Sequence, residues 1–230
     1  MKMSREKDKK ANLWLTVVFI FYIFMTTLQM GANQEVLNGD FWAHWSVGRI
    51  ANNYGYAHIY DLSTLAKYQY KTNVADVVPA PYPALFILPF QIFALFPPIL
   101  GVWAWRAINL FALIAYLAFL LRKFNLGKFD FYILAAIVLT LPVLINFIWA
   151  QVNVFAMIGI GEFIRLGKKG NLFASGAALG LSLIKPQLLI LLGPMLLLTR
   201  NWKALTGLLA SGLGIGLGSI LLTGINGGSP

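Results

Sequence analysis

The sequence predicts an all-α membrane protein: a polytopic bundle of about seven transmembrane helices, with surface helices in its first outside loop. The first observation is composition, because 59% of the residues are hydrophobic and only 11% are charged, against about 25% charged residues in an average soluble domain. The second is that long apolar runs recur along all 230 residues. The third is that the cations stand in short clusters beside these runs, as in the cytoplasmic loops of membrane proteins.

Charge and residue types also exclude several classes of function. The net charge of +10 suggests nucleic acid at first sight, but a nucleic-acid-binding protein carries a continuous basic face, so we predict no nucleic-acid partner. The chain has no cysteine, which excludes disulfides and thiolate chemistry. Its two histidines, His44 and His58, cannot form a conventional zinc site alone. We predict neither a metal site nor a cofactor.

The N-terminal region predicts the first span. Five cations and two acids precede the first apolar run, so residues 1–11 are predicted to be cytoplasmic and residues 12–30 to form a transmembrane helix. No small-x-small cleavage pattern follows this run, which favours an uncleaved signal anchor over a signal peptide. The polar, aromatic segment that follows, residues 31–81, then lies outside.

The next apolar segment, residues 82–96, is predicted not to cross the membrane. The stretch between Pro83 and Pro97 gives a helix of about 20 Å, shorter than a hydrocarbon core of roughly 30 Å. A full crossing would also put three basic clusters outside: Arg122-Lys123-Lys128, Arg165-Lys168-Lys169 and Arg200-Lys203. We therefore assign residues 31–98 to one extracytoplasmic loop, with surface helices and a non-crossing apolar segment.

Six further spans within residues 99–223 complete the predicted bundle, and residues 224–230 form an extracytoplasmic end. The predicted limits of these spans are 99–121, 129–147, 148–164, 172–184, 187–199 and 204–222. The two arms beside Lys185-Pro186 are short, so a single kinked helix is the alternative there. Glycines on the last span predict close helix packing: Gly207, Gly212, Gly214, Gly216 and Gly218.

The outside loop is the first candidate site, because it holds half of the eight acidic residues, Asp40 and Asp61 among them. If residues 40–52 are helical, Asp40, His44 and Val47 share one face. The plainer interpretation is a surface helix with aromatic side chains at headgroup depth. The functional interpretation is a sugar or headgroup site, where aromatic faces pack on pyranose rings and a carboxylate takes a hydroxyl proton.

Polar residues in the predicted bundle form the second candidate site. Lys185 lies between apolar arms and is costly there unless it is paired or faces a wet cavity. It is therefore either a snorkelling loop lysine or a cation for a lipid phosphate. Gln151 and Asn153 lie at another outside turn, where they line the same cavity or bond neighbouring helices. Arg106, inside the second span, either faces the cavity or pairs with an acid.

A series of short motifs links the two candidate sites. In order, the chain contains G-D-F-W-x-x-W with A-x-x-x-x-G and I-Y-D, then P-Y-P-A-L-F-I-L-P-F, A-L-F-P-P, A-Q-V-N, G-L-S-L-I-K-P-Q and T-R-N-W-K-A-L. From about Asp40 to Leu205 this order resembles glycosyltransferase family 87, polyprenyl-phosphate-mannose-dependent mannosyltransferase-like membrane proteins of the GT-C superfamily. The resemblance implies a helix bundle open to the outer leaflet. Family members are usually longer, so a short or truncated member is expected.

The resemblance also implies roles for individual residues. The acid of the first outside loop, a general base in the family, falls on Asp40. The basic residue expected near the donor phosphate falls on Lys185. The loop and the resemblance together predict a substrate cavity lined by His44, Trp45, Arg49, Tyr60, Asp61, Tyr82, Gln151, Asn153 and Gln187.

These expectations predict a hexosyltransferase that moves a hexose, with mannose favoured, from a polyprenyl-phosphate donor to a lipid or glycan acceptor, with inversion. Its partners are then the donor, the acceptor and membrane lipids, and it is a multi-pass plasma-membrane protein with an outward-facing active site. A transporter or flippase for a lipid-linked substrate is the first alternative, but it predicts inverted repeats and charge at mid-membrane, whereas these charges gather at the outer surface. A non-catalytic scaffold with a degenerate site is the second.

Overall fold

The computed structural model describes residues 40–70, 76–124, 136–137 and 140–224. Every element in these ranges is an α-helix or a 3-10 helix (labelled η), which confirms the all-α prediction for them. The predicted first span, residues 12–30, lies outside the described residues, as do residues 129–135 and 138–139 of the predicted span 129–147. The elements are α2 (Asp40–Tyr54), η2 (Tyr56–His58), α3 (Leu62–Tyr68), η4 (Ala84–Ile87), α4 (Leu88–Phe93), α5 (Pro98–Phe124), α7 (Leu141–Ile148), α8 (Asn153–Lys168), α9 (Leu172–Ala178), η6 (Leu179–Ile184), η7 (Pro186–Leu188), α10 (Leu189–Leu198) and α11 (Trp202–Thr223).

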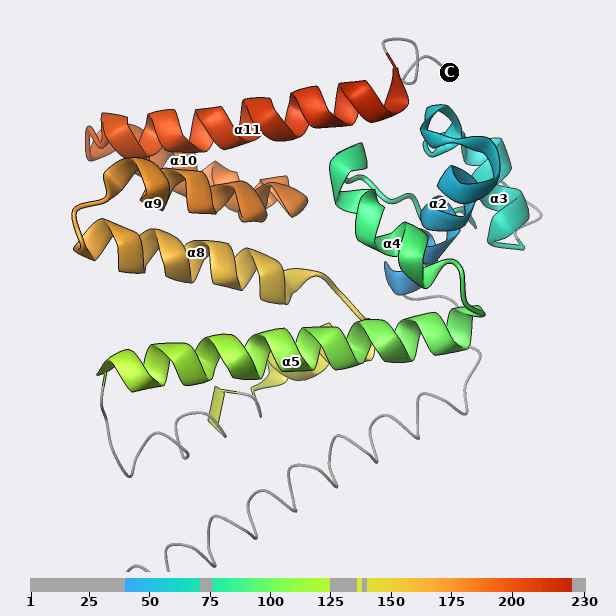
Figure 1. Cartoon of the computed structure of the whole chain (residues 1–230), viewed down its shortest axis with the longest axis horizontal. Coiled ribbons are helices and arrows are strands. Elements are labelled where there is room, and N and C mark those ends of the chain that lie inside the picture. The colour runs from blue at the N-terminus through green and yellow to red at the C-terminus, as the bar shows by residue number, and fades with distance from the viewer. Residues whose placement is uncertain (1–39, 71–75, 125–135, 138–139, 225–230) are drawn as a thin grey trace, which may run out of the picture.

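The long helices lie side by side, and the loop helices gather at one end of them. Figure 1 shows α5, α8, α9 and α11 running roughly parallel to one another, with α2, α3 and α4 near the start of α5 and the end of α11. The turn that leads into α8 lies at this same end, whereas the basic turn between α8 and α9 lies at the opposite end. The arrangement therefore brings the loop helices and the turn at residues 149–152 together.

Within the described residues, two helices are long and apolar enough to span a bilayer. Pro98–Leu121 has 24 residues and Trp202–Thr223 has 22, so at about 1.5 Å per residue both exceed a core of roughly 30 Å. Large apolar side chains stand exposed on both, including Phe111 at 76% and Leu221 at 85%, as lipid-facing surfaces require. The apolar stretches on either side of Lys185 are shorter, and the seven-span bundle remains a prediction.

The chain turns back on itself at Lys185. The residue before a proline is driven out of the helical region, and Lys185 has φ −131° and ψ 81° ahead of Pro186. The helical segments therefore separate: η6 ends at Ile184, and α10 begins at Leu189 after the single turn of η7. In Figure 1, α9 and α10 run in opposite directions, so these arms form a hairpin rather than one kinked helix.

Glycine allows α9 and α11 to meet main chain to main chain. A Cβ atom on Gly207 would lie 2.8 Å from the main-chain nitrogen of Ala177, and one on Gly176 would lie 2.5 Å from the carbonyl carbon of Ala204. Gly214 and Gly216, farther along α11, have no atom within 4 Å of such a Cβ. The predicted glycine packing is therefore confirmed near the start of α11 and wrong at these two later positions.

This difference predicts opposite effects of one substitution on the same helix. Gly207→Ala should lower the melting temperature in detergent, because the added methyl group forces α9 and α11 apart. Gly214→Ala should leave the melting temperature unchanged or raise it, since alanine favours a helix by about 1 kcal/mol over glycine. Differential scanning fluorimetry of the two purified variants checks this. Equal melting temperatures for both would contradict the close contact.

Candidate active site

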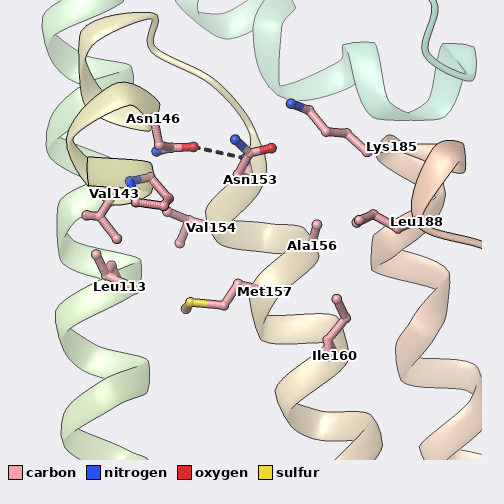
Figure 2. Close-up of a pocket in the computed structure, with 11 residues that line it drawn as sticks. Leu113, Val143, Asn146, Asn153, Val154, Ala156, Met157, Ile160, Lys185 and Leu188 are labelled. Carbon is pink, nitrogen blue, oxygen red and sulfur yellow. Dashed lines mark hydrogen bonds between the residues drawn. The ribbon is translucent and has the colours of Figure 1, made fainter. Parts of the chain in front are cut away.

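A pocket of about 380 Å³ opens between α5, α7, α8 and the Lys185 turn. Its lining is apolar over most of its surface, and its polar side chains are Asn146, Asn153 and Lys185. Figure 2 shows these three residues toward one end, with Leu113, Met157 and other apolar side chains farther along. The complete lining is Leu113, Pro142, Val143, Asn146, Asn153, Val154, Ala156, Met157, Ile160, Lys185 and Leu188.

The polar end of the pocket is shaped by the turn between α7 and α8. Ala150 takes a positive φ of 49°, which stops the helix and redirects the chain. The side-chain oxygen of Asn146 accepts the main-chain N–H of Asn153 at 3.1 Å, and Asn153 donates from its side chain to Gln151. This mutual bonding fixes Asn153 at the rim of the pocket. Gln151, predicted to line the cavity, supports Asn153 and is not among the lining residues.

Asn146 is a site residue that the sequence reasoning missed. It is 3% exposed, on a helix whose other residues are apolar. An asparagine in such a helix costs free energy unless its amide is bonded. Asn146 lies five residues before Gln151, and this closeness in sequence is the signal that could have identified it. The side-chain oxygen of Asn146 accepts the Asn153 N–H and so stabilises the turn before α8.

Lys185 approaches the pocket from the opposite side. Its main-chain N–H donates to the Ser182 carbonyl at 2.9 Å, and its own carbonyl accepts from the N–H of Leu188 at 3.0 Å. With its backbone held, the half-buried side chain reaches across the polar end toward Asn153 (Figure 2). A cation at the mouth of an apolar pocket is suited to an amphiphilic anion, because the apolar walls exclude water that would screen the charge.

The loop carboxylate lies at the start of α2. Asp40 is the first residue of this helix and is half-buried, a position where the helix dipole favours a negative charge. His44, one turn later, is 1% exposed, and its Nδ1 bonds the Asp40 carbonyl. The His44 ring packs between Tyr82 and Phe90, with ring centroids 4.8 and 4.5 Å away. Asp40 and His44 therefore share a face of α2 as predicted, with His44 turned into the aromatic core.

Electrostatic interactions link Asp40 and Lys185 to the buried His44. Burial lowers the pKa of His44 from 6.5 to about 4; the carbonyl and charge of Asp40 act to raise it, and the charge of Lys185 acts to lower it. Burial, followed by the charge of Asp40, raises the pKa of Tyr82 to about 12. His44 is thus neutral and Tyr82 protonated at neutral pH. The charges of Asp40 and Lys185 both act on the buried imidazole of His44, but Asp40, His44 and Tyr82 are not among the residues that line the pocket.

Three residues predicted for the cavity instead bond main-chain carbonyls. Trp45 donates from its indole N–H to Phe96 at 3.1 Å, and Arg49 donates to Ala94 at 2.9 Å. The Tyr60 hydroxyl donates to the carbonyl of Tyr82 at 2.6 Å. These contacts hold the loop helices against the segment that carries Tyr82. None of these residues lines the pocket, and Gln187, exposed on η7, does not line it either.

Asp61 caps a helix. Its carboxylate accepts the main-chain N–H of Ser63 at 3.0 Å, the Ser63 hydroxyl at 2.9 Å and the Thr64 hydroxyl, at the start of α3. The bonds from Thr64 and Ser63 lower the pKa of this exposed carboxyl. These contacts are those of an N-cap aspartate, a residue type that typically stabilises a helix by about 1 kcal/mol.

Arg106 faces the α7–α8 turn. It donates to the carbonyl of Ile148 at 2.9 Å, and its guanidinium stacks on the ring of Trp103 at 5.4 Å. No acidic partner for it occurs in the described ranges, and it is not among the pocket-lining residues. Those ranges also contain no group of three His, Asp or Glu side chains that could hold a metal ion.

Comparison with known proteins identifies the family. The family model of glycosyltransferase family 87 matches residues 81–227. The match includes Tyr82, both sides of the pocket and Lys185, and it begins after Asp40. No curated protein and no solved structure matches the chain. Because the family model covers more than half of the sequence, the chain belongs to glycosyltransferase family 87.

Proposed function

We propose that this glycosyltransferase moves a hexose, with mannose favoured, from a polyprenyl-phosphate donor to a lipid or glycan acceptor. The observation that carries the proposal is an apolar pocket with one lysine at its polar end, inside the matched family region. A polyprenyl phosphate has the same two parts, an isoprenoid chain and an anionic head. Its first isoprene units suit the apolar walls, and its phosphate suits the ammonium group of Lys185.

Reaction at this site needs one general base. Asp40 takes the proton of the acceptor hydroxyl as its oxygen attacks the anomeric carbon. The bond from that carbon to the phosphate oxygen breaks, and the polyprenyl phosphate leaves with the electron pair. Attack from the face opposite the leaving group inverts the anomeric centre. The phosphate leaves without protonation, unlike the alkoxide of a glycoside, so the second carboxylate used by glycosidases is unnecessary.

Lys185 supports this reaction by stabilising charge on the departing phosphate. Negative charge on the leaving oxygen grows in the transition state, so a fixed cation nearby lowers the barrier. The apolar pocket walls keep the local dielectric constant low and strengthen the effect. His44, neutral at pH 7 because burial holds its pKa at about 4, adds no competing positive charge beside Lys185.

The proposed setting is the plasma membrane, with a multi-pass chain and an active site that faces outside. The apolar exposed faces of α5 and α11 support residence in a bilayer. The basic turn between α8 and α9 lies at the end opposite α2 and α4 (Figure 1). Because basic turns stay on the cytoplasmic side, this supports an outward-facing position for the Asp40 and Lys185 region.

Transfer from radiolabelled polyprenyl-phosphate mannose tests the function directly. Membranes that contain this chain should move the label into the lipid or glycan fraction, and control membranes should not. The same assay with polyprenyl-phosphate glucose reports the hexose preference. Movement of intact donor across vesicles without transfer would contradict the proposal and indicate a transporter.

Removal of the base should abolish transfer without unfolding the protein. Asp40→Asn keeps the size and polarity of the side chain and loses its basicity, so turnover should fall by about 100-fold or more, the usual contribution of a general base. Asp61→Asn is the matched control: it changes the N-cap of α3 and should transfer normally. Initial rates at saturating donor measure both variants. Near-normal turnover by Asp40→Asn would overturn the assignment of the base.

Removal of the cation should weaken donor use. Lys185→Gln should raise the KM for the donor and lower kcat, because it loses a charge-assisted contact of about 1.5–3 kcal/mol to the phosphate. Lys203→Gln, at the start of α11 and away from the pocket, is the control with the same change of charge and should behave as the parent protein. Unchanged kinetics for Lys185→Gln would show that the phosphate binds elsewhere.

A further inference from the structure

We infer that two basic turns, at the end of the bundle opposite α2 and α4, form a binding site for an anionic phospholipid that carries two phosphates, as diphosphatidylglycerol does. The first turn, residues 168–172, leads from α8 into α9, and the second, residues 198–202, leads from α10 into α11. We call them the twin turns. They are separate from the pocket, so the inference depends on neither the donor nor the base proposed above.

The twin turns have the same main-chain geometry. Gly170 and Arg200, at equivalent places, take positive φ angles of 77° and 52°. Asn171 and Asn201 follow with φ −84°, and each caps the next helix by accepting the main-chain N–H of an alanine three residues later. Each asparagine N–H donates to a leucine carbonyl five residues earlier, at 3.1 Å in the first turn and 2.9 Å in the second. The same short sequence pattern therefore builds both turns.

Glycine packing places the twin turns next to each other. A Cβ atom on Gly176 of α9 would meet Ala204 of α11, and one on Gly180, farther along the same arm, would meet Ser211. Both contacts advance in the same direction along the chain, so the two arms are parallel. Figure 1 shows α9 and α11 beginning at the same end of the bundle. The turns that lead into these helices therefore lie at neighbouring positions.

The twin turns carry exposed cations. Lys168, Lys169 and Arg200 are all exposed, and no acidic residue follows Glu162 in the sequence. In the described ranges, the one ion pair joins Glu162 to Arg165, so that carboxylate already has a partner. Lysine attracts a phosphate as a point charge, and arginine donates two parallel N–H bonds to it. A headgroup with one phosphate for each turn fits best, because binding at one turn raises the effective concentration at the other.

Arg200 occupies a position that suits glycine. The left-handed region of φ is unfavourable for a residue with a Cβ atom, and the first turn avoids this cost with Gly170. The second turn accepts the cost and gains a cation. Residues held in such conformations cluster at functional sites, and the charge is the feature that glycine would remove here.

The start of a candidate span identifies a lipid headgroup as the occupant. Trp202 is the first residue of α11, one of the two described helices long enough to cross a bilayer, and it is 58% exposed. Tryptophan at the end of a span lies at headgroup depth. Leu198, at the end of α10, is 84% exposed and suits acyl chains. The cations beside them lie at the level of the lipid phosphates, where basic sites between membrane helices bind such headgroups.

Binding of defined lipids to the purified full chain in detergent tests the site. Native mass spectrometry should show that diphosphatidylglycerol binds more tightly than phosphatidylglycerol, which has one phosphate, and that phosphatidylcholine binds least. Lys168→Gln/Lys169→Gln should lower the affinity for diphosphatidylglycerol about 25-fold, since each cation near a lipid surface contributes about fivefold. Arg122→Gln/Lys123→Gln, at the end of α5, is the control with the same change of charge and should bind this lipid as the parent protein does.

Arg200→Gly separates lipid binding from folding stability. It should lower the affinity for diphosphatidylglycerol about fivefold. Its melting temperature without lipid should equal or exceed that of the parent protein, because glycine adopts a positive φ without steric cost. An arginine with only a structural role would give the opposite pair of results, a lower melting temperature and unchanged lipid binding.

Each other result overturns the inference. Equal losses of affinity in the α5 control and the turn variants would show general charge attraction rather than a built site. Equal affinity for the lipids with one and two phosphates would exclude a site that spans both turns. Protection from thermal unfolding by inorganic pyrophosphate alone would show a soluble phosphate ligand. Unchanged lipid binding in every variant would leave the cations to an acidic protein partner.

Discussion

The contact between α2 and α4 is the interaction on which the candidate site depends. Asp40 lies at the start of α2, so its position over the bundle is set by how that helix is held. Gly48 lets the two main chains approach closely, and the donors Trp45, Arg49 and Asn52 bond carbonyls at the end of α4. Because α4 also packs on α5 through Phe90 and Trp105, these contacts join the loop to the membrane helices.

A second constraint acts on charge. Several polar side chains are buried in the apolar interior of the described residues. Asn146 bonds the turn before α8, and Lys185 stands at the mouth of the pocket. The buried imidazole of His44 is kept neutral by the cost of desolvation. Of the charged side chains near the candidate site, Arg106 bonds the carbonyl of Ile148, whereas Lys185 lines the pocket.

From the sequence, the helical class is predicted outright, and the described residues confirm it. The helix from Asp40 is a conditional expectation, the break at Lys185 competes with one kinked helix, and a shared cavity for Lys185 and Asn153 is one of two interpretations. These follow from local rules: hydropathy, a pre-proline residue and the cost of polar groups among apolar ones. The sequence could not separate cavity residues from structural ones within the loop. Trp45, Arg49 and Tyr60 carry the donors that a sugar site needs, but tertiary packing directs them to carbonyls. Asn146 was missed because its partner, the Asn153 N–H, is defined only once the turn has formed.

The glycine contact between α9 and α11 has a consequence for turnover. Where Gly176 and Gly207 bring two main chains together, neither helix can slide or rotate without collision. The hairpin that carries Lys185 is attached to this pair, so the main chain at Lys185 is held in place. For the role proposed for Lys185, this means that less main-chain reorganisation is needed in each catalytic cycle.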